Sequence, residues 1–250
     1  MTKAFVSQRR EIKYLARESE MAALMDRIGK VLVADRHGAG GGYVNHSIYF
    51  DGPGLSFYRE KAEGLAVRAK PRLRLYKSTA DGAARAIFLE FRHRDRHFVA
   101  KQRAPLTAAE AARLLDGDTV LATAAGDGGG PLARFAYMVR RLDLRPAVGV
   151  LYHRSAYRSA IHPTLRLTFD RRLRGTACCE LMPPQGAFAD LLAPGRGIIE
   201  IKYNGAAPAW LLRATEALEL DMVSFSKFAE AIERTVRPVG NMYYPVGRRG

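Results

Sequence analysis

The sequence predicts an α+β protein in which antiparallel strands carry one charged face and one apolar face. Seven segments alternate apolar and polar residues with the period of two that strands show, and five others repeat apolar residues at helical spacing. Of the 250 residues, 48% are hydrophobic and 26% are charged, which is typical of globular proteins. This length is at the upper end for one domain, and an all-β or barrel-like domain often fills it.

The first part of the chain predicts a strand, a helix and a second strand. Ser19 is expected to cap the helix by accepting a backbone hydrogen bond, and apolar residues at helical spacing continue the helix to Leu32. The glycine-rich stretch 38–42 lacks the Lys-Ser/Thr ending of a phosphate-binding loop, so we interpret it as a plain loop. The predicted strands are 11–15 and 43–50.

The middle of the chain predicts a β-hairpin and a helix. Two long strands, 66–77 and 86–97, are joined by a loop around Asp81 and Gly82, a dipeptide that favours tight turns. Thr107 is expected to cap an alanine-rich helix that continues to about Leu115.

The rest of the chain predicts three more strands and three more helices. Pro208 suits the start of a helix because proline already has the helical φ angle. No linker divides the chain, so we expect a single domain over residues 1–240 and a flexible tail over 241–250. The strands are 146–158, 164–171 and 197–203, and the helices are 132–142, a segment opened by Pro208 that includes Trp210 to Leu220, and 226–236.

The charge of the chain points to an anionic partner. Lys and Arg number 40 against 25 Asp and Glu, which gives a formal net charge of +15. Residues 68–103 contain eleven basic and three acidic residues, so about half of the excess lies in one short segment. A balance of this kind favours nucleic acid, an acidic membrane surface or phosphate-rich molecules as partners.

We expect a cytoplasmic protein without a membrane span. Basic residues near the N-terminus are not followed by the apolar run of a signal peptide. The apolar stretches are far shorter than the ~18 residues that a membrane span needs. Cys178 and Cys179 are adjacent, which suits neither an ordinary disulfide nor a zinc site, so we interpret them as thiols in a reducing compartment.

Four cations are expected on one face of the strand 66–77. Side chains alternate between the two faces of a strand, and an antiparallel sheet with one wet face is the ordinary explanation for such a pattern. Like charges at successive positions of one face repel, however, and four in a row need an anion to compensate them. The cations are Arg68, Lys70, Arg72 and Arg74, and Tyr76 follows them.

Two other strands place a carboxylate beside a lysine. Glu11 is followed two positions later by Lys13, and Glu200 by Lys202. Carboxylate oxygens hold Mg²⁺ or Mn²⁺, whereas arginine and lysine bind phosphate oxygens. The combination favours a metal–polyphosphate ligand, and a sheet closed with its apolar side outward would make a charged tunnel.

Nine segments, in this order, resemble the polyphosphate polymerase domain of the vacuolar transporter chaperone (VTC) family, within the triphosphate tunnel metalloenzyme superfamily. The similarity spans about residues 9–232. It implies an eight-stranded antiparallel β-barrel tunnel flanked by helices. The segments are 10–14 (REIKY), 43–51 (YVNHSIYFD), 68–76 (RAKPRLRLY), 88–92 (FLEFR), 101–103 (KQR), 152–154 (YHR), 166–170 (RLTFD), 199–202 (IEIK) and 224–227 (SFSK).

The resemblance also implies roles for single residues. Glu200 would be the chief ligand of Mn²⁺ or Mg²⁺, with Glu11 and Glu90 as helpers. Arg92 stands where family members often have lysine, and its planar guanidinium changes the local phosphate geometry. The implied catalytic set is Lys13, Arg72, Arg74, Lys101, Arg154, Arg166 and Glu200, and further phosphate contacts are Lys70, Arg92, Lys202, Ser226 and Lys227.

The implied function is transfer of the γ-phosphate of ATP to a growing polyphosphate chain. This reaction needs positioning and charge neutralisation rather than a dedicated base, and the chain shows no nucleophile motif and no ligand spacing among its six histidines. Two alternatives stay open: hydrolysis of tripolyphosphate or a nucleoside triphosphate, and a non-catalytic polyphosphate-binding module. Nucleic acid is not the expected partner, because few aromatic residues lie among the basic ones. The residues leave the oligomeric state open.

Overall fold

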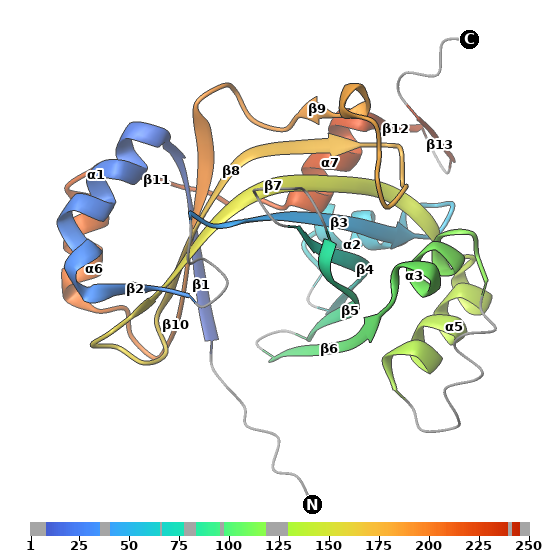
Figure 1. Cartoon of the computed structure of the whole chain (residues 1–250), viewed down its shortest axis with the longest axis horizontal. Helices are drawn as coiled ribbons and strands as arrows, with labels where there is room; N and C mark the ends of the chain where they lie inside the picture. The colour runs from blue at the N-terminus through green and yellow to red at the C-terminus, as the bar shows by residue number, and fades with distance from the viewer. Residues whose placement is uncertain are drawn as a thin grey trace, which may run out of the picture. The chain divides into compact units, whose positions relative to one another are not determined.

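The computed structural model describes residues 9–35, 41–65, 67–77, 84–95, 98–118, 130–239 and 242–245. The chain folds into two compact units, whose elements are labelled in Figure 1. Strands β7 and β8 contribute residues to both units, and the expectation of one domain over 1–240 stays a prediction. Unit 1 comprises Met1–Val44, Tyr152–Leu173 and Leu192–Phe225, and unit 2 comprises Asn45–Leu151, Arg174–Leu191 and Ser226–Gly250.

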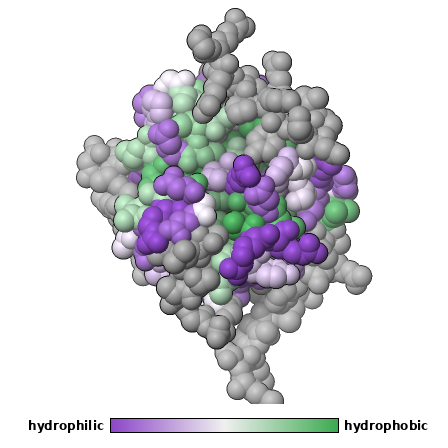
Figure 2. Space-filling model, turned by 90° about the vertical axis from the view of Figure 1, so that its right-hand side faces the viewer, coloured by the Kyte–Doolittle hydropathy of each residue, from purple (hydrophilic) through white to green (hydrophobic). Residues whose placement is uncertain are grey.

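The surface mixes charged and apolar residues. On the face shown in Figure 2, hydrophobic residues lie next to strongly hydrophilic ones. Large hydrophobic side chains that reach solvent include Tyr137, Ile161 and Met222. Among the described residues, no helix combines the length and the apolar character that crossing a bilayer requires.

The sheet of unit 1 is antiparallel and has the strand order β11-β1-β10-β8-β7, with β2 paired to β7. In the β1–β10 register Glu11 stands opposite Lys202, and Lys13 opposite Glu200. The pairing therefore brings together the two carboxylate–lysine pairs of the sequence. The strands are β1 (Arg9–Arg17), β2 (Leu32–Ala34), β7 (Arg145–Ser159), β8 (Arg166–Thr176), β10 (Arg196–Asn204) and β11 (Asp221–Met222).

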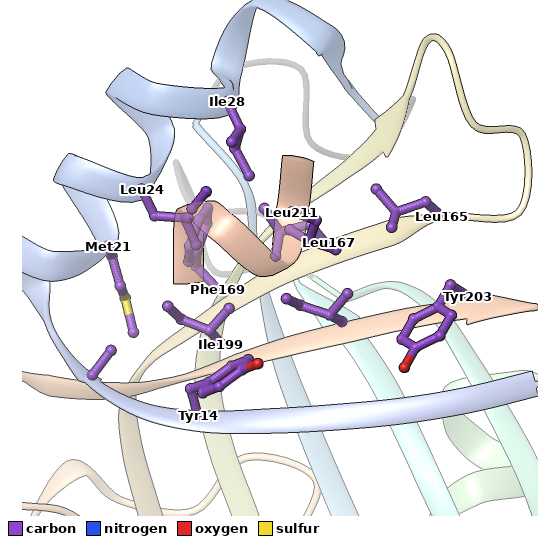
Figure 3. Packing of buried hydrophobic residues seen from close by; sticks show 13 residues of the cluster. Tyr14, Met21, Leu24, Ile28, Leu165, Leu167, Phe169, Ile199, Tyr203 and Leu211 are labelled. Carbon is purple, nitrogen blue, oxygen red and sulfur yellow. The ribbon is translucent and has the colours of Figure 1, made fainter. Parts of the chain in front are cut away.

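Helices α1 (Glu18–Ile28) and α6 (Ala209–Glu216) cover the apolar face of this sheet, as Figure 3 shows. Leu167 and Phe169 on β8 and Ile199 on β10 are fully buried under these helices. Their polar neighbours in the alternation lie on the opposite face of the strands. The predicted division into one apolar and one charged face is therefore confirmed for unit 1.

Helix α1 begins and ends differently from the prediction. Arg17, not Ser19, is the N-cap residue, and its backbone N–H donates to the carboxylate of Glu20 at 2.6 Å. Ser19 lies inside the helix. The helix ends at Ile28, because a 3₁₀ turn, η1 (Gly29–Val31), follows it and Leu32 already belongs to β2.

The sheet of unit 2 has the strand order β7-β3-β4-β5-β6, with β9 paired to β8. The predicted hairpin is confirmed by the antiparallel β4–β5 register, in which Arg72 stands opposite Glu90. Its turn at Asp81 and Gly82 lies outside the described residues, as does the side chain of Arg68. The strands are β3 (Tyr43–Asp51), β4 (Val67–Lys77), β5 (Ala84–Asp95), β6 (Phe98–Leu106) and β9 (Ala189–Asp190).

Two helices of unit 2 have side-chain caps, of which the one at Thr107 was predicted. Oγ1 of Thr107 accepts a hydrogen bond from the backbone of Glu110 at 3.2 Å, and Oγ of Ser226 accepts one from Ala229 at 3.4 Å. Phe135 fixes helix α5 to the sheet through an edge-to-face contact with Phe50, 4.8 Å between ring centroids. The helices are α2 (Ser56–Ala62), α3 (Ala108–Leu115), α5 (Pro131–Leu142), η2 (Gln185–Ala187) and α7 (Lys227–Thr235).

The mixture of helices and antiparallel strands confirms the predicted α+β class. Strand pairs that would close the eight-stranded barrel are not among those of the described residues, so the tunnel stays a prediction. The expected flexible tail, 241–250, includes β13 (Met242–Pro245), which pairs with β12 (Val236–Val239). The other residues of that tail lie outside the described residues.

Candidate functional site

Two arginines on the charged face of β4 are buried. Arg72 and Arg74 are 6% and 9% exposed, and Glu90, opposite them on β5, is 0% exposed. Leu73 and Leu75 of the same strand are buried as well. A strand whose arginines are almost as buried as its leucines is not the wet face of an ordinary antiparallel sheet. These arginines therefore belong to an internal ionic site.

In unit 2 the buried charges gather around Glu90. The β5 cluster, as we name it, consists of Tyr49, Arg72, Arg74, Glu90 and Lys101. Oε2 of Glu90 accepts hydrogen bonds from Nε and Nη2 of Arg72 at 3.0 and 2.7 Å. Nε of Arg74 lies 3.8 Å from the same oxygen, and Nζ of Lys101 lies 2.7 Å from Oε1. One carboxylate thus sets the direction of three cations.

The cations keep Glu90 ionised despite its burial. Burial alone would raise the pKa of this carboxyl group, but the charges of Arg72, Arg74 and Lys101 outweigh that effect and lower the pKa to about 2. For Lys101, burial lowers the pKa, and Glu90 opposes that change. Three cations share a single carboxylate, so the cluster has the charge to bind an anion.

Strand β3 supplies hydrogen-bond acceptors for the two arginines. Nη1 of Arg72 donates to the hydroxyl of Tyr49 at 3.2 Å, and Nε of Arg74 donates to Oγ of Ser47 at 3.3 Å. Burial would raise the pKa of Tyr49, but Arg72 and Arg74 outweigh it and lower the pKa. Neither Tyr49 nor Ser47 is in the predicted site, although their spacing of two on a strand could have indicated a shared face.

The start of α7 lies next to this cluster. Nζ of Lys70 donates to Oγ of Ser226 at 3.2 Å, and Ser226 caps α7. Lys227, the first residue of the helix, acts on Tyr49 through its charge and lowers its pKa. The structure therefore brings Lys70, Ser226 and Lys227 together with the β5 cluster. Their contact with phosphate stays a prediction.

Arg92 completes a row of cations across three strands. In the sheet register it stands opposite Lys70 on β4 and opposite Lys101 on β6. Like charges directly opposite each other on neighbouring strands are destabilising. The row therefore favours an anion at this position, as the predicted phosphate-binding role of Arg92 requires.

Unit 1 contains a second ionic group, the β10 cluster, and a bidentate ion pair is its centre. Nε and Nη2 of Arg154 donate to the two oxygens of Asp170 at 2.6 and 2.7 Å, and Nη2 also donates to Oε2 of Glu200 at 3.2 Å. Burial would lower the pKa of Arg154, but Asp170 and Glu200 outweigh it and raise the pKa. The β10 cluster consists of Glu11, Lys13, Arg154, Asp170, Glu200 and Lys202.

One lysine of the β10 cluster connects two of its carboxylates, and a second lysine contacts one of them. Nζ of Lys202 lies 3.4 Å from Oε2 of Glu11 and also forms an ion pair with Glu200. Nζ of Lys13 lies 3.1 Å from Oε1 of Glu11 and donates to the backbone carbonyl of Phe225 at 2.8 Å. The β1–β10 register thus places all four predicted residues of these two strands in one network.

The two clusters differ in charge balance. The β10 cluster has three carboxylates and three cations, whereas the β5 cluster has one carboxylate for three cations. An excess of cations suits phosphate, whose oxygens only accept hydrogen bonds. Carboxylates in a balanced network can exchange a cationic partner for a metal ion. The structure therefore favours different ligands for the two clusters.

The β10 cluster has the donor set that Mg²⁺ or Mn²⁺ prefers. Thr168 stands opposite Glu200 in the β8–β10 register, and its buried Oγ1 has no hydrogen-bond partner among the described residues. Carboxylate and hydroxyl oxygens are hard ligands that fit these metals. The described residues hold no ready-made site of three or more His, Cys, Asp or Glu, so phosphate and water oxygens would complete the coordination.

The three predicted metal ligands are divided between the clusters. Glu11 and Glu200 share the β10 cluster, where Lys202 contacts both. Glu90 belongs to the β5 cluster, and cations contact both of its oxygens. The geometry of Glu90 therefore favours a role in positioning cations, and its role as a metal helper stays a prediction.

Arg166 has a partner that lies outside the predicted site. Its Nη2 donates to Oδ2 of Asp35 at 2.6 Å, and Asp35 is 4% exposed. Arg166 also stands opposite Lys202 in the β8–β10 register, next to the β10 cluster. Asp35 follows a three-residue strand and shows no pattern that could have identified it.

The family model of the VTC domain matches residues 8–236 of this chain. None of the curated proteins matches the sequence. Among solved structures, the PH1819 protein from Pyrococcus horikoshii OT3 is similar, with a TM-score of 0.46 and 14% identity over 90% of this chain and 99% of that one. A putative adenylate cyclase from Vibrio parahaemolyticus has a TM-score of 0.46 and 11% identity over 89% of this chain and 96% of its own. These two TM-scores are too low to identify a fold. The relationship of this chain to known proteins therefore rests on the family match alone.

Proposed function

Because this chain belongs to the VTC domain family, we propose that it is a metal-dependent polyphosphate polymerase that transfers the γ-phosphoryl group of ATP to polyphosphate. The family supports a function that involves polyphosphate or a triphosphate. The observation that carries the finer proposal is the group of cations around the fully buried Glu90, of which Arg72 and Arg74 are themselves buried. With their neighbours in the sheet and at α7, the cations are Lys70, Arg72, Arg74, Arg92, Lys101 and Lys227.

The cations supply what the reaction requires. A terminal oxygen of polyphosphate attacks the γ-phosphorus, the bond to the bridging oxygen breaks, and ADP leaves. The attacking oxygen is already ionised, so positioning and neutralisation of charge carry the catalysis. Arg72 and Arg74 present planar, multi-donor groups that match phosphate oxygens, while Glu90 holds both in place.

The β10 cluster would hold the metal. When bound, Mn²⁺ or Mg²⁺ neutralises phosphate oxygens in a transfer of this kind. Glu200 would be its chief ligand, with Glu11 as a helper, and Arg154 and Lys202 orient the carboxylate of Glu200. The barrel tunnel that the family resemblance implies stays a prediction within this proposal.

A polymerase assay tests the proposal. Purified protein is incubated with ATP and Mn²⁺, and the products are separated on a gel stained for polyphosphate. We expect a ladder of chain lengths from the wild type and a loss of at least about 100-fold in Glu200→Gln, because a neutral amide binds a metal poorly. Glu216→Gln, at an exposed position of α6, is the matched control and should keep the ladder. An undiminished ladder from folded Glu200→Gln would contradict the site.

The same assay distinguishes the alternatives. Free phosphate without a ladder would indicate a phosphohydrolase. Polyphosphate binding without metal dependence and without either product would indicate a binding module. Nucleic acid is a poorer candidate, because the two arginines of the β5 cluster, Arg72 and Arg74, are buried rather than displayed among exposed aromatic rings. The use of ATP fits the cytoplasm, where we expect the protein to act.

A further inference from the structure

A pocket of about 550 Å³ lies between the end of α1, the turn η1 and the helix α6 of unit 1. This volume is within the range of sites for small molecules. The pocket belongs to neither ionic cluster. Its lining residues are Arg27, Ile28, Lys30 and Val31 from α1 and η1, and Trp210, Arg213, Ala214 and Ala217 from α6 and its end.

The polar part of the lining is entirely cationic. Arg27, Lys30 and Arg213 are exposed, and no acidic residue lines the pocket. These three side chains form no hydrogen bond or ion pair with other described residues. Their donors are therefore available, and three positive charges at one pocket attract an anion with more than one negative charge.

The remaining lining is apolar and includes an indole. Trp210 is partly buried and packs against the core of unit 1, and Ile28 is 5% exposed at the base of the pocket. Ala214 and Ala217 are small and leave room beside the indole. Aromatic rings of ligands stack on tryptophan and on arginine guanidinium groups. The pocket thus combines a surface for a flat ring with donors for phosphate.

We propose that this pocket binds a nucleoside phosphate, with its base against Trp210 and its phosphates at Arg27, Lys30 and Arg213. The site is distinct from the β10 cluster. Helices α1 and α6 cover the face of the sheet that carries Ile199, whereas Glu200 points to the opposite face. The pocket therefore binds nucleotide independently of the proposed transfer reaction.

Tryptophan fluorescence reports on this pocket directly. Trp210 is the single tryptophan of the chain. Titration of the full-length protein with ADP, without metal, should change its emission in a saturable manner. Arg213→Ala should weaken ADP binding about tenfold, because a hydrogen bond to a charged group is lost. Arg213→Lys keeps the positive charge but loses the planar guanidinium group. Its affinity for ADP should therefore lie between the affinities of Arg213→Ala and the wild type.

Two ligand fragments test the chemical class. Adenosine has the base without phosphate, and inorganic tripolyphosphate has phosphate without the base, so each should bind at least about tenfold more weakly than ADP. Equal affinity for tripolyphosphate would overturn the proposal by showing that the base contributes nothing. Absence of a saturable change with ADP at millimolar concentration would overturn it as well.

A second set of variants keeps this proposal separate from the polymerase proposal. Glu200→Gln should leave the ADP-dependent change of Trp210 emission intact, because Glu200 lies on the other face of the sheet. Loss of that change in folded Glu200→Gln would assign the signal to the β10 cluster and overturn the pocket. Arg213→Ala should keep the polyphosphate ladder, so failure of the ladder assay does not affect the test of the pocket.

Discussion

At the scale of the residue, the partners of a glutamate decide what it does. Glu90 is 0% exposed and has cations at both oxygens, which makes it the anchor of the β5 cluster. Glu200 is shared between Arg154 and Lys202 in a balanced network and lies opposite the unpartnered hydroxyl of Thr168. The same residue type thus suits a positioning role in one unit and a metal-binding role in the other.

Glu90→Gln tests the anchoring role. The variant removes the counter-charge that the buried Arg72 and Arg74 share with the exposed Lys101, which should lower the free energy of unfolding by about 3 kcal/mol. Tripolyphosphate should raise the melting temperature of this variant more than that of the wild type, because the anion replaces the lost charge. Thermal unfolding with and without tripolyphosphate measures both effects, and Glu216→Gln, at an exposed position of α6, is the control.

The difference in stability between the wild type and Glu90→Gln should depend on pH. The pKa of Glu90 is lowered from 4.5 to about 2 in the folded protein, so its contribution to stability is complete above pH 4.5 and is lost as the pH falls toward 2. The difference between wild type and Glu90→Gln should therefore shrink over that range. A difference that is constant between pH 6 and 3 would contradict the ion-pair explanation.

For two ion pairs, the sequence predicted the arginine as a site residue and not its aspartate partner. Period-two alternation identified Arg72, Arg74 and Glu200 because neighbouring positions of their own strands carry the pattern. Asp35 was not found, since its partner Arg166 is 131 positions away and the fold brings them together. Asp170 continues the alternation of its strand, but only the structure shows that its carboxylate holds Arg154.

At the scale of the element, a single buried carboxylate organises the start of α2. Asp51, at the end of β3, accepts backbone hydrogen bonds from Gly52, Phe57 and Tyr58 at 2.8, 3.0 and 3.0 Å. Leu55 precedes the helix with a left-handed φ of 53°, which the helix start requires. The segment shows no ordinary capping box, and for this reason α2 was not predicted.

Asp51→Ala should therefore destabilise the protein more than the loss of an ordinary cap. Three backbone N–H groups lose their acceptor, and we expect a decrease of about 2–3 kcal/mol in the free energy of unfolding. Thr107→Ala, which removes the exposed cap of α3, should cost about 1 kcal/mol. Chemical denaturation measures the free energy of unfolding of both variants. Equal losses of stability would contradict the special role of Asp51 and show that it acts as an ordinary helix cap.

Strands with a clear alternation were predictable, and strands without one were not. Strands β4, β5, β7 and β10 repeat the alternation often enough to identify the element and its apolar face. Strand β6 was missed because its residues 101–103 (KQR) are all polar and exposed, so they show no alternation of apolar and polar residues. Only the pairing with β5, seen in the structure, identifies this segment as a strand. The two-residue strands β9 and β11 are too short to show any periodicity.

At the scale of the whole molecule, the net charge of +15 is unevenly distributed along the chain. About half of the excess lies in residues 68–103, the segment that supplies Arg72, Arg74, Glu90 and Lys101 of the β5 cluster. The β10 cluster of unit 1 is balanced, and its carboxylates suit a metal ion. Our central proposal is that the β5 cluster, whose two arginines are buried, binds phosphate rather than forming an ordinary solvated face.

Calorimetric titration with inorganic tripolyphosphate tests this claim most directly. The wild type should bind it, and Arg74→Ala should bind at least about tenfold more weakly, because a charge-assisted contact is lost from the β5 cluster. Arg145→Ala, which removes an exposed arginine paired with Asp143, should bind like the wild type. Equal affinity of folded Arg74→Ala and wild type would contradict the account.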